Sequence, residues 1–216
     1  MANIFSPWKF NPHFGRLSDD MTEIILGSQS PRRREILHYF SIPFRQMTPP
    51  FDESQVLFQG YPAQFVIEVA RRKALCLSEK HPHIPILTAD TTVCKDGQLF
   101  QKPESLEEAH AMLRELAGKK HEVHTGVCVA LGDAFYVDSE KSTVEFHSLT
   151  DDQIRAYHKT ISPLDKAGAY AIQKTGSLIV KRIEGCYYNI MGLPLHAMHR
   201  LLLKVGIDLW EYLKPL

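Results

Sequence analysis

The chain has 216 residues, of which 44% are hydrophobic and 23% are charged, and its 25 basic residues balance 25 acidic ones. This composition excludes a disordered or low-complexity chain, and the balanced charge gives no support to a nucleic-acid-binding protein, which usually carries a basic excess. A domain of this length buries a sufficient core without a metal or a disulfide.

The first 22 residues differ from the rest of the chain. They mix proline, glycine, asparagine and isolated aromatic residues and have no continuous apolar stretch, so no signal peptide is expected. We expect residues 1–22 to form a mobile arm, with Met21 as an alternative natural start. No apolar run approaches the roughly 20 residues that span a bilayer. The four cysteines are far apart, and without a secretion signal they predict reduced thiols and a cytoplasmic location.

Strands and helices are predicted to alternate in the first half of the chain. Short apolar runs bounded by turn residues indicate strands, whereas apolar residues at helical spacing after a serine or proline indicate helices. The expected elements are a strand at 23–28, a helix that Ser30 caps, a strand at 44–47, a helix at 62–79 and a strand at 84–89 that ends at Asp90.

Hairpins are predicted in the middle of the chain and helices near its end. The expected elements are a hairpin around the turn at 95–97, a helix after a capping box of Ser105 and Glu108, a long hairpin over 123–131 and 134–146, a helix over 150–160, a strand at 177–183 and a helix at 193–205. We find no internal repeat or linker. The pattern predicts one α/β domain over residues 23–216, with two lobes, a mixed twisted sheet, flanking helices and a cleft.

Three consecutive arginines stand at the beginning of the first predicted helix. If Ser30 is the N-cap, residues 32–34 occupy about the second to fourth helical positions. Cations there oppose the helix dipole, and each destabilises the helix by about 0.3–1 kcal/mol. A bound anion would reverse that effect, because free N–H groups, serine hydroxyls and guanidinium groups would all bind it. The segment therefore indicates a phosphate site. The alternative is a surface helix whose arginines pair with acidic neighbours such as Glu35.

Acidic residues follow a strand and occupy a proline-rich loop. Asp90 ends an apolar strand, and ligands of open α/β sheets bind beyond the carboxyl ends of strands. A carboxylate there can hold Mg²⁺ or accept a proton from water, or it can simply bond to the backbone of a turn. Asp52 and Glu53 could likewise ligate a cation or remain solvated.

Two lysines and a glutamine are further candidates for binding. Lys102 precedes Pro103, which restricts it to extended geometry, and Lys73 lies on the polar side of a predicted helix. Each could reach a phosphate or be a solvated lysine. Gln173 offers an acceptor and two donors that match a pyrimidine edge, with a structural glutamine as the alternative. The sequence has no P-loop and no GxSxG elbow.

Six motifs together resemble the Maf-like family. They are SQSPRRREIL, ARRKA at 70–74, TADTTV, QKPES, LDKAGAYAIQ and GCYYNIMGLPL, in the order typical of that family. The resemblance covers about residues 23–205. It implies a nucleoside triphosphate pyrophosphatase, which cuts between the α- and β-phosphates and needs a divalent metal, Mg²⁺ or Mn²⁺. It also implies a mixed sheet split by a deep central cleft, as in the inosine triphosphatases.

The resemblance also implies roles for individual residues. Asp90 corresponds to the catalytic proton acceptor, and Asp90 and Glu53 to metal ligands. The residues that correspond to the family's substrate-binding positions are Ser30, Arg32, Arg33, Lys73, Thr91, Lys102 and Gln173. Arg32, Thr91 and Gln173 match positions that separate subfamilies, and here they resemble the branch that cleaves dTTP and UTP. Standard and modified pyrimidine nucleotides both remain open as substrates.

These inferences lead to a geometric expectation and leave two alternative functions. Arg32 and Asp90 should face the same hollow, since one would hold the triphosphate that the other helps to hydrolyse. A nucleoside triphosphate substrate and a homodimer are expected, without a nucleic-acid or membrane partner. The alternatives are a non-catalytic nucleotide-binding regulator of septum formation and a phosphomonoesterase, which would release inorganic phosphate.

Overall fold

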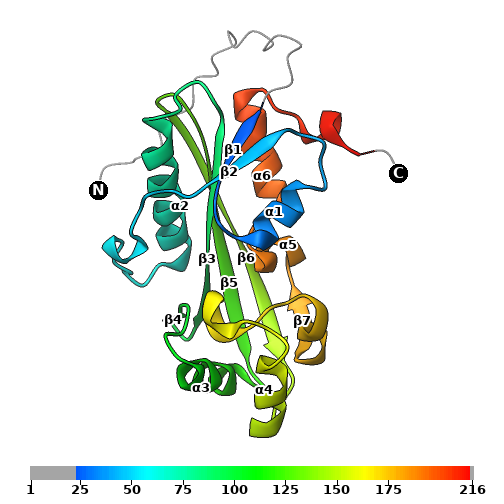
Figure 1. Ribbon diagram of the computed structural model, residues 1–216. Coiled ribbons are helices and arrows are strands. Elements are labelled where there is room, and N and C mark those ends of the chain that lie inside the picture. The colour runs from blue at the N-terminus through cyan, green and yellow to red at the C-terminus, as the bar shows by residue number, and fades with distance from the viewer. Residues whose placement is uncertain (1–22, 215–216) are drawn as a thin grey trace, which may run out of the picture.

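The computed structural model describes residues 23–214 (Figure 1). The predicted arm at 1–22, with Met21, lies outside the described residues. The strands within 23–214 are β1 (Ile24–Gly27), β2 (Phe44–Met47), β3 (Ile86–Lys95), β4 (Gln98–Phe100), β5 (Lys120–Leu131), β6 (Ala134–Phe146) and β7 (Val180–Glu184). The α-helices of the same range are α1 (Pro31–Leu37), α2 (Pro62–Ser78), α3 (Leu106–Leu116), α4 (Asp151–His158), α5 (Tyr187–Met191) and α6 (Leu195–Leu202). None of them has the length and apolar character needed to cross a membrane.

The described strands form one sheet with the order β2-β1-β3-β5-β6-β7, and β4 pairs with β3 beside this path. β1 runs parallel to β2 and β3, whereas the pairs β3–β5, β5–β6 and β6–β7 are antiparallel. Long strands β5 and β6 form the predicted hairpin and run through both the upper and the lower part of the molecule (Figure 1). The prediction of a mixed sheet with flanking helices is confirmed.

One edge of β3 is interrupted at its middle. Along this edge β1 pairs with β3 as far as Thr88, and β4 begins to pair with it only at Val93. Residues 89–92 therefore lie in a gap that neither neighbouring strand covers. The gap divides the sheet into an upper half, which contains β1 and β2, and a lower half, which contains β4 and β7 (Figure 1).

The apolar core is divided at the same level. In the upper half, Ile24 and Leu26 pack with α1 and α6 on one face of the sheet, while Ile25 packs with α2 on the other. This alternation follows from the two-residue period of a strand. In the lower half, a separate cluster contains Leu113 of α3 and Ile154 of α4. Each half of the sheet thus has its own covering helices.

Helix α2 lies unusually close to the sheet. A Cβ atom placed on Gly126 of β5 would come within 2.4 Å of the carbonyl carbon of Val66, so only glycine fits this position without a shift. The hydroxyl of Thr88 on β3 also donates a hydrogen bond of 2.7 Å to the carbonyl oxygen of Ala70 on α2. The first contact fixes α2 against β5, whose Gly126 pairs with Asp90, and the second fixes it against β3, the strand that carries Asp90.

Most predicted elements occur where the sequence placed them, with two differences near the site. Ser30 caps α1 as predicted, and its side chain accepts from the backbone N–H of Arg33. The strand expected to end at Asp90 continues to Lys95, so Asp90 stands in mid-strand. The helix expected at 193–205 begins only at Leu195 and is preceded by the separate helix α5.

Candidate active site

The Arg33 side chain extends from α1 to the gap in the sheet. Its Nε donates to the carbonyl oxygen of Gly192 at 2.7 Å. One terminal nitrogen donates to the Ser28 hydroxyl at 3.1 Å, and the other to Oγ1 of Thr91 at 3.0 Å. Burial lowers the pKa of Arg33, and the nearby Asp90 carboxylate opposes that shift. The guanidinium group is therefore held in one orientation, with two of its five N–H groups left for a ligand.

A chain of hydroxyl groups fixes Thr91 behind this guanidinium. Oγ1 of Thr125 donates to the backbone oxygen of Asn189 at 2.8 Å and lies 2.9 Å from Oγ1 of Thr91. Because the Thr125 hydroxyl has one hydrogen, the Thr91 hydroxyl must be the donor in the contact between the two threonines. Its oxygen is then the acceptor for Arg33. Thr91 thus supports Arg33 here, and its direct contact with substrate stays a prediction.

A buried lysine bridges two carboxylates next to Arg33. Nζ of Lys73 lies 2.8 Å from Oδ1 of Asp90 and 2.7 Å from Oε1 of Glu53. The side chains of Lys73 and Asp90 are 9% and 11% exposed, whereas that of Glu53 is half exposed. The three groups come from α2, from β3 and from the 3₁₀ turn Glu53–Gln55. Helix, strand and loop thus bring opposite charges together at the gap.

The charges around Glu53 keep it ionised. Burial acts to raise its pKa, but the ammonium group of Lys73, and then Lys102 and Arg33, lower it below the usual value for glutamate. The adjacent Asp52 behaves differently, since its exposed carboxylate accepts from the backbone N–H two residues on at 3.0 Å. Of the two loop acids, only Glu53 reaches the gap.

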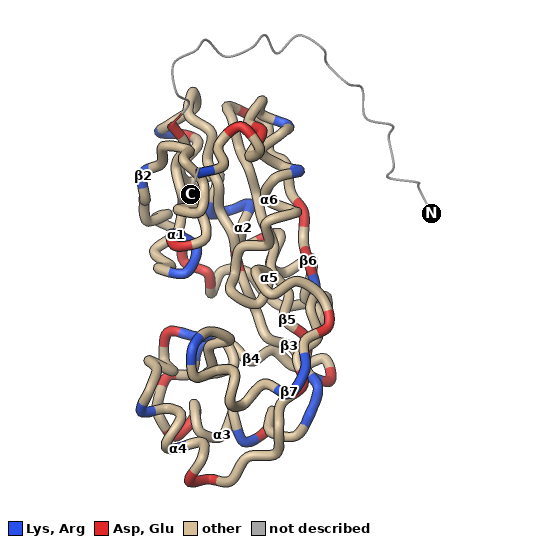
Figure 2. The backbone as a smooth tube through the Cα atoms, turned by 90° about the vertical axis from the view of Figure 1, so that its right-hand side faces the viewer, with Lys and Arg blue, Asp and Glu red and all other residues tan. Residues whose placement is uncertain are grey.

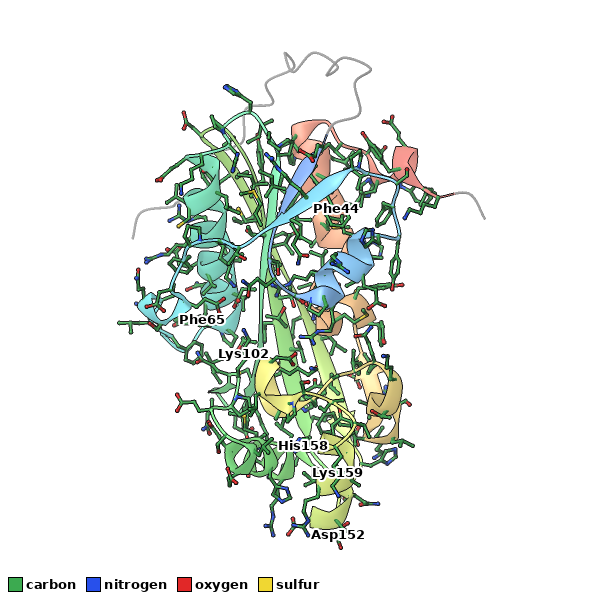
Figure 3. The ribbon with its side chains drawn as sticks, viewed as in Figure 1. Phe44, Phe65, Lys102, Asp152, His158 and Lys159 are labelled. Carbon is green, nitrogen blue, oxygen red and sulfur yellow. The ribbon has the colours of Figure 1, made fainter. Side chains whose placement is uncertain are left out.

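Lys102 approaches the gap from the lower half. It follows β4 in the chain, and Figure 3 shows it at the level where the halves meet, below the Phe65 end of α2. Its charge contributes to the lowered pKa of Glu53, which places the two side chains near each other. The coloured tube in Figure 2 shows a basic stretch at α1 on the opposite side of the same gap. Cations therefore border the gap from both halves.

The lower half also faces α1 through one hydrogen-bonded contact and one charge interaction. Burial lowers the pKa of Arg32, and the charge of Asp165 opposes this shift, so Asp165 lies near that guanidinium group. The Gln173 amide nitrogen donates to the Glu35 carboxylate oxygens at 3.2 and 3.4 Å. Glu35, a candidate partner for the arginines in the sequence, is thus paired instead with the glutamine expected to meet the base.

The carboxylates at the gap fit a hard divalent cation bound together with a polyphosphate. No group of three or more His, Cys, Asp or Glu side chains within residues 23–214 forms a complete metal site. Asp90 and Glu53 nevertheless converge on one cationic nitrogen, that of Lys73. Mg²⁺ usually keeps several waters and binds one or two carboxylates plus substrate phosphates, and Mn²⁺ favours the same oxygen ligands. The two carboxylates meet that requirement.

Of the predicted residues, Ser30 caps α1 and Gln173 contacts Glu35 on that helix, whereas Glu53, Lys73, Asp90, Thr91 and Lys102 lie around the gap. Arg32 and Arg33 border it, whereas Arg34, the third arginine of the run, is exposed. Arg33, rather than Arg32, is directly influenced by Asp90. The residues that sequence analysis did not single out for the site are Ser28, Glu35, Thr125, Asp165, Asn189 and Gly192. All of them except Thr125 lie within the motifs quoted above: Ser28 and Glu35 in SQSPRRREIL, Asp165 in LDKAGAYAIQ, and Asn189 and Gly192 in GCYYNIMGLPL.

Comparison with known proteins identifies a family and close relatives. The family model described as Maf-like protein matches residues 23–205. A protein of Chlamydia caviae named dTTP/UTP pyrophosphatase is 43% identical over 192 residues, which cover 88% of this chain and 98% of that protein. A protein of Caldicellulosiruptor bescii with the same name is 43% identical over 198 residues, with the same coverage of 88% and 98%. The solved Ham1 protein of Staphylococcus aureus aligns with a TM-score of 0.43 at 15% identity, over 72% of this chain and 90% of that one.

Proposed function

This chain belongs to the Maf-like protein family, and from that premise we propose that it is a nucleoside triphosphate pyrophosphatase that hydrolyses dTTP and UTP. The products are the nucleoside monophosphate and pyrophosphate. The names of the relatives from Chlamydia caviae and Caldicellulosiruptor bescii support this substrate pair. Residues 23–216 would act as one catalytic domain with two lobes, and modified pyrimidine nucleotides would be further substrates.

One observation carries the proposal: Lys73 holds Asp90 and Glu53 together, next to the guanidinium group of Arg33. Both carboxylates lie within 2.8 Å of the same nitrogen. A pair of carboxylates beside fixed cations suits a metal-bound triphosphate, which needs both signs of charge at close range. The same gap would thus bind the phosphates and place a base next to them.

Asp90 would accept the proton of the attacking water. Its Oδ1 is engaged by Lys73, whereas Oδ2 accepts no hydrogen bond from the residues at 23–214. Oδ2 would therefore be the oxygen that takes the proton while the water oxygen bonds to the α-phosphorus. The bond from that phosphorus to the bridging oxygen breaks, and pyrophosphate leaves with the electron pair.

Cations from both halves would bind the triphosphate and stabilise the leaving pyrophosphate. Arg33 has two free N–H groups, and Arg32 and Lys102 add charge from α1 and from the lower half. Ser30 would place the first turn of α1 against a phosphate. Fixed charges stabilise a transition state more in a site with little water than in solution.

Asp90 and Glu53 would hold the divalent cation, Mg²⁺ or Mn²⁺. When bound, such an ion neutralises phosphate charge and polarises the scissile bond. Lys73 would then keep the two carboxylates next to each other. The amide of Gln173 would meet the pyrimidine, with Thr91 close to the phosphates.

The remaining expectations belong to the same proposal. All four cysteines are free thiols, which supports the cytoplasmic location because structural disulfides form in oxidising compartments. The homodimer stays a prediction.

A screen of the products tests the proposed function directly. The full chain is incubated with each common nucleoside triphosphate and Mg²⁺ or Mn²⁺, and pyrophosphate and orthophosphate are measured separately. We expect pyrophosphate from dTTP and UTP in preference to purine nucleotides, and no turnover after chelation of the metal. Orthophosphate as the product would indicate a phosphohydrolase instead. Binding of dTTP without any product would support the non-catalytic regulator.

A further inference from the structure

The Gln173 amide has a fixed orientation because its partner is a carboxylate. Its nitrogen lies 3.2 Å from one carboxylate oxygen of Glu35 and 3.4 Å from the other. An ionised carboxylate accepts hydrogen bonds and cannot donate them. The side of the amide that faces Glu35 must therefore be the NH₂ group, whatever ligand is present. The carbonyl oxygen of the amide then points away from Glu35.

Both partners of this contact are themselves held in place. The Glu35 carboxylate is also hydrogen-bonded to the hydroxyl of Tyr39, whose pKa is raised by burial and then by the charge of Glu35. On the other side, buried Ile172 anchors the chain just before Gln173, and the Gln173 carbonyl oxygen accepts from the N–H of Gly176 at 2.9 Å. Both side chains therefore project from segments that other contacts hold in place.

The fixed amide still offers one donor and one acceptor to a ligand. One hydrogen of the NH₂ group bonds to Glu35, which leaves the second hydrogen and the carbonyl oxygen. Uracil and thymine present an N3–H donor next to a carbonyl acceptor. The amide oxygen can accept from N3–H while the remaining amide hydrogen bonds to the adjacent base carbonyl. In cytosine the roles are reversed, because N3 is an acceptor and the exocyclic amino group is a donor.

We propose that Glu35 is a specificity-determining residue, which selects uracil and thymine over cytosine by preventing the Gln173 amide from rotating by half a turn. To pair with cytosine, the amide must rotate by half a turn. That rotation would remove the hydrogen bond to Glu35 and bring the carbonyl oxygen of Gln173 against the Glu35 carboxylate. Two acceptors in contact repel each other. Glu35 acts on the base through Gln173 and is therefore a positioning residue. The inference rests on the proposed function and on Gln173 meeting the base.

The substitution Glu35→Gln tests this role with little change in size. An amide at position 35 can present either its oxygen or its NH₂ group, so the Gln173 amide becomes free to rotate by half a turn. We expect the ratio of kcat/KM for UTP to that for CTP to fall about tenfold, mainly because CTP becomes a better substrate. The matched control is Glu79→Gln, which neutralises an exposed carboxylate at the end of α2 and should leave the ratio unchanged.

Two further measurements separate positioning from a general structural effect. In a Gln173→Ala background, Glu35→Gln should no longer alter the UTP to CTP ratio, because the amide that it orients is absent. Binding of the uncleavable α,β-methylene analogues of UTP and CTP should show the same loss of discrimination without any turnover. An unchanged ratio in Glu35→Gln, in an enzyme whose wild type cleaves UTP, would overturn this inference and leave the proposed function standing. A wild type that does not cleave UTP would overturn both.

Discussion

Replacing Asp90 with asparagine is expected to lower kcat for UTP hydrolysis by about 10²–10⁴-fold, the usual contribution of a positioned general base. Asparagine keeps an oxygen that can accept from Lys73, and Glu53 continues to bind the same ammonium group. It cannot take a proton from water at neutral pH. The loss should therefore appear in turnover, which steady-state measurement of pyrophosphate release determines, while thermal unfolding shows whether the fold is kept.

Asp52→Asn is the matched control for this change. Asp52 belongs to the same proline-rich part of the chain as Glu53, but it is exposed and only caps the 3₁₀ turn that follows it. Asparagine is also a good N-cap, so both stability and kcat should stay near those of the wild type. Near-native turnover of Asp90→Asn would contradict the role of Asp90 as proton acceptor.

Replacing Gly126 with alanine should damage both stability and activity. The added Cβ would lie 2.4–2.6 Å from backbone atoms of Val66 and Ile67, which cannot move without moving α2. Overpacking of a core costs about 1–3 kcal/mol, and a clash with backbone places this change near the upper limit. A loss of about 3 kcal/mol corresponds to a fall in Tm of about 6–12 °C for a domain of this size. A displaced α2 would also carry Lys73 away from Asp90.

Gly97→Ala provides the comparison for Gly126→Ala. Gly97 has a φ of +78° in the β3–β4 turn, and a Cβ there meets no atom within 4 Å. Alanine should cost about 1–2 kcal/mol through backbone strain and leave activity intact. Differential scanning fluorimetry and the pyrophosphate assay measure both effects. A Gly126→Ala protein with wild-type Tm and turnover would show that α2 does not need its close approach to β5.

The local elements of the fold could be predicted from the sequence because their signals are local. Ser30 and Pro31 mark the start of α1 by their own chemistry, and the turn Gly132-Asp133 separates two strands of alternating pattern. The prediction that β3 ends at Asp90 was wrong for a physical reason. Asp90 and Thr91 interrupt the apolar run because they bond to Lys73 and Arg33 at the gap, and the strand itself continues.

The parts of the site that depend on tertiary structure could not be predicted. Helix α5 has only five residues, too few for a periodic pattern, yet Asn189 on it anchors Thr125 through a backbone oxygen. Gly192 ends this helix with a φ of +106° and offers its carbonyl oxygen to Arg33, 159 residues earlier in the chain. Such contacts leave no mark in local spacing. For the same reason, the sequence indicated a cluster of cations but not that Arg33 is the one beside Asp90.

In the proposed reaction, the gap in the sheet positions a water molecule for attack on the α-phosphorus, with Asp90 as proton acceptor. Hydrolysis of UTP in water enriched in oxygen-18 tests it most directly, because the product that carries the label identifies the phosphorus atom attacked. We expect one labelled oxygen in UMP and none in pyrophosphate. Label in pyrophosphate, with unlabelled UMP, would show attack at the β-phosphorus and contradict it.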